Sequence, residues 1–197
     1  QNNAQLSGGF FEYDTSGNIK HLYSYNKGQG SNNSTQNYIP ANYDLNSTYS
    51  FDAHGNIKEV SKTDGTHIVY IWGYNHSQPI AKIENATYAQ LLSHVPNLQT
   101  KSNTDTHRSV DTIAENGVKI YANDSEGNLR EALDGLRDTL PNALVTTYTY
   151  DPLIGVTSMT DPRGSTIYYN YDAFNRLKHV KDQDGNILSK NDYNYKN

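Results

Sequence analysis

Aspartates that stand beside proline and glycine are the residues of this sequence whose type and spacing could do chemistry. Asp151 precedes a proline, and a second Asp-Pro pair opens the run Asp161-Pro162-Arg163-Gly164. Two carboxylates that share one proton in a site shielded from water are the chemistry of aspartic proteases. However, no second motif follows Gly164, and a proline at the second position of a turn already presets φ. The pattern therefore favours a turn over a protease site at Asp161.

The run from Asp182 to Asn186 begins like a calcium-binding loop. In an EF-hand the sixth residue is glycine and the twelfth is a bidentate glutamate, whereas this sequence has Ile187 and Tyr193 at those positions. A hairpin turn is the better interpretation of the run, with a loosely bound surface cation as the alternative.

No other motif indicates a metal, a cofactor or a catalytic residue. The seven histidines are dispersed, without the spacing of metal ligands, at positions 21, 54, 67, 76, 94, 107 and 179. The sequence also has no nucleophile elbow, phosphate-binding loop or dinucleotide fingerprint. We therefore expect a non-enzymatic protein without metal or cofactor.

Composition and charge restrict the partners. The 197 residues carry a net charge of -5 and no basic stretch, which argues against nucleic acid or an anionic membrane. No apolar run approaches the roughly 20 residues of a membrane-spanning helix. Cysteine is absent, so no disulfide is expected, and tyrosine, with 17 residues, is the main large aromatic. Tyrosine suits half-buried sheet surfaces where the ring packs and the hydroxyl stays hydrated.

The elements that must position these aspartates come from an internal repeat. Four pairs of residues are all separated by the same 21 positions, namely Tyr150 and Tyr171, Asp151 and Asp172, Asp161 and Asp182, and Gly164 and Gly185. Earlier units have the same form, with Tyr13, Asp14 and Gly17 in one and Phe51, Asp52 and Gly55 in the other. A fixed period in the twenties is typical of repeat architectures, in which each unit buries its face only against its neighbours.

Each unit alternates an aromatic strand with a tight turn. Asp-x-x-Gly and Asp-Gly segments permit the positive φ of hairpin turns, and the aspartate is expected to accept N–H bonds inside its own turn. Alternation places both rings of a Tyr-x-Tyr strand on one sheet face. We therefore predict an antiparallel meander that forms a curved sheet. Its aromatic ladder is Tyr13, Phe51, Tyr150 and Tyr171, and its turn glycines are Gly17, Gly55, Gly164 and Gly185.

A helical insert interrupts the repeats. After Tyr88, apolar residues recur at helical spacing until Pro96, which is expected to end that helix. A second stripe, capped by Asp124 or Ser125, consists of Leu129, Leu133, Leu136 and Leu140. We expect the stripe to dock on the sheet. The predicted organisation is a first sheet block at 1–84, a two-helix insert at 85–141 and a second block at 142–197, in one repeat domain cut from a larger protein. The segment 28–46 is predicted to be an exposed loop.

The repeat units resemble the Rhs/YD-repeat family. The unit closest to its Tyr-x-Tyr-Asp-x-x-Gly-Arg-Leu hallmark begins at Tyr169 and ends at Leu177, with Asn175 in place of the glycine. The stretch from Tyr70 to Ile83, ahead of the insert, looks like the arrangement in large Rhs-type proteins of Bacteroidetes. The resemblance implies a hollow shell that can enclose a C-terminal toxin domain, and secretion or display at the bacterial cell surface.

Family shells can also close with a self-cleaving motif that contains Asp-Pro-x-Gly, which the run from Asp161 to Gly164 matches. Since Asp161 aligns with Asp182 of the next unit, a turn remains the preferred interpretation. The function predicted from the sequence is thus a structural shell segment, with neighbouring repeats, and an enclosed toxin domain or surface glycans, as its partners. The alternative is a carbohydrate- or cell-surface-binding repeat module, in which tyrosines stack on sugar rings.

Overall fold

The computed structural model describes residues 8–25 and 43–194, which form thirteen strands and three helices. Eleven strands make one antiparallel sheet, in the order β1-β2-β3-β4-β5-β6-β9-β10-β11-β12-β13. Each strand thus pairs with the strands of this sheet that come before and after it in the chain, which confirms the predicted mainly β meander with a helical insert. The chain divides into two compact units, residues 1–69 and 70–197.

The first unit contains strands β1 (Gly9–Tyr13), β2 (Ile19–Tyr25), β3 (Tyr43–Phe51), β4 (Ile57–Lys62) and the beginning of β5 (His67–Gly73). Its core is small. Tyr23 is buried and packs edge-on against Phe10, while the carboxylate of Glu12 accepts hydrogen bonds from the Tyr23 hydroxyl and the His21 ring. The predicted loop 28–46 lies mostly outside the described residues, and its last part, 43–46, belongs to β3.

The second unit continues β5 and adds six strands to it. These are β6 (Gln78–Glu84), β9 (Leu144–Asp151), β10 (Gly155–Thr160), β11 (Thr166–Tyr171), β12 (Leu177–Asp182) and β13 (Ile187–Lys190). Strand β6 pairs directly with β9, from Ala81 opposite Thr147 to Glu84 opposite Leu144. Everything between Glu84 and Leu144 therefore takes the place of one hairpin turn.

The insert holds helices α1 (Tyr88–Leu91), α2 (Val95–Asn103) and α3 (Ser125–Thr139), and a small hairpin of β7 (Thr112–Ile113) and β8 (Lys119–Ile120). The predicted count of two helices is one too low. Pro96 lies in the first turn of α2 instead of ending a helix. Proline is tolerated there because the first N–H groups of a helix have no partner within the helix.

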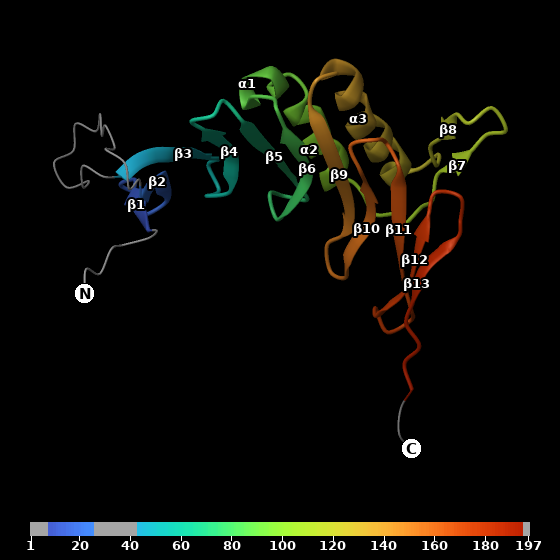
Figure 1. The fold of residues 1–197 in the computed structure, drawn as a ribbon. Coiled ribbons are helices and arrows are strands. Elements are labelled where there is room, and N and C mark those ends of the chain that lie inside the picture. The colour runs from blue at the N-terminus through green and yellow to red at the C-terminus, as the bar shows by residue number, and fades with distance from the viewer. Residues whose placement is uncertain (1–7, 26–42, 195–197) are drawn as a thin grey trace, which may run out of the picture. The chain divides into compact units, whose positions relative to one another are not determined.

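Helices α2 and α3 lie against one face of the strands of the second unit (Figure 1). The predicted leucine stripe makes this contact, since Leu129, Leu133 and Leu136 are fully buried and Leu140 is nearly so. From the sheet, Ile71, Ile83 and Val145 are equally buried. The docking expected from the 3.6-residue period is thus confirmed. Asp124 is the N-cap and accepts a hydrogen bond from the Gly127 N–H.

Candidate functional site: repeated turns and a buried polar network

One turn geometry recurs at seven places in the described part of the chain. In each, the N–H of the first residue donates to the carbonyl of the fifth, and the N–H of the fourth donates to the carbonyl of the first; the turns begin at Asp14, Asp52, Lys62, Ala114, Asp161, Asp172 and Asp182. The fourth residue has φ between 60° and 86°. It is glycine except at Asn175, because left-handed geometry suits only glycine and asparagine well.

The aspartates at the first position stabilise five of these turns. In Asp172, for example, Oδ1 accepts the N–H groups of Phe174 at 2.8 Å and Arg176 at 3.0 Å. The same two bonds recur at the other four, Asp14, Asp52, Asp161 and Asp182. A carboxylate that accepts N–H bonds is favoured in its charged form, and the guanidinium of Arg176 adds to this by lowering the pKa of Asp172 to about 2.

The turn from Asp151 to Gly155, between β9 and β10, differs from the others. The N–H of Ile154 donates to the Asp151 carbonyl as in the other turns, but the glycine comes one position later, at Gly155 with φ 150°, and only Leu153 donates its N–H to the Asp151 carboxylate. The other carboxylate oxygen binds the guanidinium of Arg108 from the insert, at 2.8 Å and 2.5 Å. Asp151 therefore joins the insert to the sheet.

The four predicted ladder aromatics lie in different surroundings. Tyr13 is 58% exposed and Phe51 is half-buried, both in the first unit. In the second unit Tyr150 is buried against Tyr74, with ring centroids 5.6 Å apart. Burial raises the pKa of Tyr150 to about 12.

Tyr150 and Tyr171 both contact the start of β10, the strand that separates them. Tyr150 pairs with Val156, and the hydroxyl of Tyr171 donates to the Val156 carbonyl at 2.8 Å. The structure thus brings Tyr150 and Tyr171 to one place on the sheet.

The Asp-Pro-Arg-Gly run forms the turn between β10 and β11. The Asp161 carboxylate is occupied by the N–H groups of Arg163 and Ser165. Two cations of the insert hold the turn from outside, since Arg137 donates to the Asp161 carbonyl at 2.9 Å and Lys119 donates to the Gly164 carbonyl at 3.2 Å. These two hydrogen bonds join the turn to the insert.

A buried polar network beneath α3 was not predicted from the sequence. Glu126, fully buried, accepts hydrogen bonds from the hydroxyls of Thr149 at 2.7 Å and of Thr157. Arg130, 3% exposed, donates two N–H groups to Asp111, both at 2.8 Å. Burial opposes the charge of Arg130, but the Asp111 and Glu126 carboxylates outweigh it and raise the pKa of Arg130.

A signal for this network was present in the leucine stripe. Glu126 lies three residues before Leu129 and Arg130 three before Leu133, so both fall on the apolar face of α3. Charged residues at core positions need partners, and the partners Thr149 and Thr157 lie on β9 and β10. The sequence pattern within α3 does not reveal that this helix packs against β9 and β10.

A second branch of the network centres on Asp105, just after α2. Its carboxylate is 2.7 Å from the hydroxyl of Tyr74, which also accepts the N–H of Tyr150. Burial raises the pKa of Asp105 above its ordinary value despite the hydrogen bond from Tyr74, and the Glu126 carboxylate raises it further.

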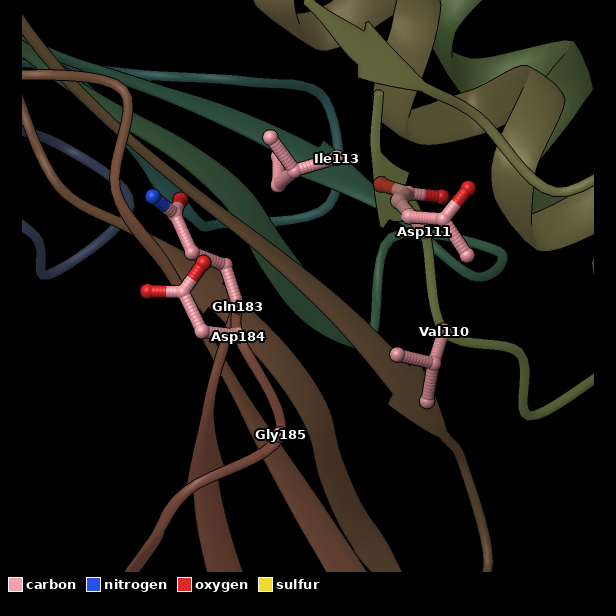
Figure 2. Close-up of a pocket in the computed structure, with 7 residues that line it drawn as sticks. Val110, Asp111, Ile113, Gln183, Asp184 and Gly185 are labelled. Atoms are coloured by element: carbon pink, nitrogen blue, oxygen red, sulfur yellow. The ribbon is translucent and has the colours of Figure 1, made fainter. Parts of the chain in front are cut away.

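A pocket of about 370 Å³ separates the insert from the β12–β13 turn (Figure 2). Val110 and Ile113 supply apolar surface on one side, and Gln183, Asp184 and Gly185 line the other. Asp111 also lines this pocket, but its carboxylate is bound to Arg130. The lining offers no cation and no paired carboxylates for chemistry.

Two further observations concern metals and membranes. Among residues 8–25 and 43–194, no group of three or more histidine or acidic side chains is placed to hold a metal ion. None of the helices in the described part of the chain is both long and apolar enough to cross a membrane.

Comparison with known proteins gives distant structural neighbours. No family model matches the sequence, and no curated protein is significantly similar to it. A solved Tc holotoxin pore of Photorhabdus luminescens, with a substitution in TccC3, has a TM-score of 0.31 at 12% identity, covering 87% of this chain and 7% of that one. The crystal structure of TcdB2-TccC3-TEV has a TM-score of 0.22 at 12% identity, covering 88% and 10%. The chain thus spans a small part of these proteins.

Proposed function

We propose that this chain is a non-enzymatic structural segment of a secreted or cell-surface repeat shell of the Rhs/YD kind. Such a shell encloses or presents a C-terminal toxin domain. The observation that supports this most is the turn geometry shared by seven hairpins, which join strands that pair in chain order. A hairpin of this kind cannot bury its own face and needs neighbours on both sides. The partners are therefore neighbouring repeats and the enclosed domain.

The use of the conspicuous carboxylates also supports a structural role. Asp161, Asp172 and Asp182 each direct one oxygen to backbone N–H groups of their own turn. A carboxylate committed in this way stabilises the chain reversal and is not placed to share a proton with a second acid.

Protease protection in the parent protein tests the proposal. A domain that follows this segment should survive trypsin in the intact protein. Combining Asp161→Ala with Asp172→Ala should hasten its cleavage, because both turns loosen. Asp138→Ala, at an exposed position of α3, is the matched control and should leave protection unchanged.

Two results would count against the proposal. A new N-terminus at Asp151 or Asp161 after incubation of the purified chain would show an autoproteolytic enzyme. Binding to a glycan array that is lost in Tyr148→Ala, without loss of stability, would favour the carbohydrate-binding alternative.

A further inference from the structure

The irregular turn between β9 and β10 forms one wall of a pocket of about 280 Å³. Asp151, Pro152 and Leu153 line it from the turn, and Asp105 and His107 line it from the insert. Leu153, the third residue of the turn, is 95% exposed at the rim. The turn therefore adds an exposed apolar side chain to the pocket.

A buried carboxylate lies in this lining. Asp105 is only 7% exposed. It accepts hydrogen bonds from the Tyr74 hydroxyl at 2.7 Å, the Ser125 hydroxyl at 3.1 Å and the His107 N–H at 3.2 Å. All three donors are neutral, and within the described residues no ion pair includes Asp105. A buried carboxylate without an opposite charge is costly, which agrees with the raised pKa of Asp105.

Neither Arg108 nor His107 forms an ion pair with Asp105, although His107 is linked to it through the Ser125 hydroxyl. Arg108 binds Asp151 through two N–H groups, and the His107 ring contacts the Ser125 hydroxyl at 2.7 Å. The pocket thus combines an uncompensated acid with the apolar surfaces of Tyr150, Pro152 and Leu153. A cation on an apolar stem matches both parts of this lining.

We propose that this pocket binds an ammonium group carried on an alkyl stem, with the ammonium at Asp105 and the stem along Tyr150 and Leu153. Both Asp105 oxygens already accept hydrogen bonds, so a bidentate guanidinium fits poorly, whereas a compact ammonium needs one remaining lone pair. The ammonium comes either from a free alkylamine or from a lysine side chain of a partner protein.

Titration of the full chain with n-butylammonium, followed by NMR, tests the site. The backbone amides of His107 and Leu153 should shift, and n-butanol should not reproduce the change. Asp105→Asn should weaken binding about tenfold or more, because a charge-assisted bond is lost. Asp184→Asn, which removes an acid from the other pocket, is the control and should bind as the unaltered chain does.

Leu153→Ser provides a second test that does not depend on the buried acid. The side chain is exposed, so the fold should persist, while affinity for n-butylammonium falls about threefold or more with the lost stem contact. A peptide with one lysine then separates the sources: binding equal to that of the amine indicates a partner's lysine, and binding of the amine alone indicates a free alkylamine. Equal affinity of Asp105→Asn and the unaltered chain, or equal binding of n-butanol, would overturn the proposal.

Discussion

Each turn aspartate takes over two backbone N–H groups that a tight reversal leaves without a partner in the strand ladder. At Asp172 this carboxylate also receives two N–H groups of Arg176, from Nε at 2.8 Å and Nη2 at 2.6 Å. These bonds require the charged form of the acid. The stability of the hairpin between β11 and β12 is therefore linked to pH.

The pKa of Asp172 gives the direction of that dependence. Its folded value of about 2 lies below its ordinary 3.8, so the contribution is complete above about pH 4 and is lost as the pH falls toward 2. Asp172→Asn should therefore show a smaller loss of unfolding free energy between pH 4 and 2 than the unaltered chain, measured by urea unfolding. An identical pH dependence in the two proteins would contradict the role of the charge.

Gly155 illustrates a glycine that the fold requires. A Cβ there would lie 2.7 Å from the Tyr171 hydroxyl, at φ 150°. Gly155→Ala should lower the unfolding free energy by about 1–3 kcal/mol, through strain and displacement of that hydroxyl.

Gly135→Ala is the opposite case, because nothing lies near the added Cβ on α3. It should raise stability by about 0.5–1 kcal/mol, and thermal unfolding of both variants would show whether the signs differ.

Among the elements, hairpins could be predicted from sequence and the helix contacts could not. The position of Asp14, Asp52 or Asp182 at the start of a turn is a local property, since its bonds reach only four residues along the chain. The leucine stripe of α3 was likewise readable from its period. The partners of Glu126 and Arg130 depend on which strands the helix meets, and a single sequence does not contain that information locally.

The start of α2 shows a different reason for a wrong prediction. A proline within an apolar period indicates the end of a helix and the first turn of the next one equally well. The sequence around Pro96 offers no glycine to mark the boundary. The end of α1 at Leu91 and the start of α2 at Val95 therefore had to come from the structure.

Packing across β9 predicts unequal roles for the aromatics. Tyr150 packs on Tyr74 and donates its hydroxyl to the Pro79 carbonyl at 3.0 Å. Tyr150→Ala should therefore cost about 3–5 kcal/mol, as for other large buried aromatics. Phe174→Ala, at a position 75% exposed in the same unit, should cost under about 1 kcal/mol. Chemical denaturation of both variants tests the difference, and equal losses would refute it.

In the molecule as a whole, the insert is added to the sheet at one turn, and the strands on its two sides, β6 and β9, pair directly with each other. Since Glu84 and Leu144 are already paired, replacing 85–143 by the five-residue turn Asp161–Ser165 should keep the strands of the second unit. Val145 and Ile83, now buried, would become exposed. We expect strand signal in circular dichroism, increased binding of a hydrophobic dye and lower stability.

A matched control for this deletion is the unaltered chain under the same conditions. Complete loss of cooperative unfolding in the second unit would show that its sheet depends on the helices. Full stability without dye binding would show that the sheet of the second unit does not need α2 and α3 to cover its apolar face.

The direct pairing of β6 with β9 has a consequence for how such chains can change. A sheet of this kind constrains only the short gap between the two ends of a reversal, and loop-closure entropy rises slowly with loop length, by about 0.6 kcal/mol for each doubling. Any foreign domain whose own ends lie close together can thus be grafted at a reversal without moving the flanking ladder. Each hairpin turn of the sheet is therefore a position that can accept an inserted domain, and in this chain residues 85–143 already occupy one of them.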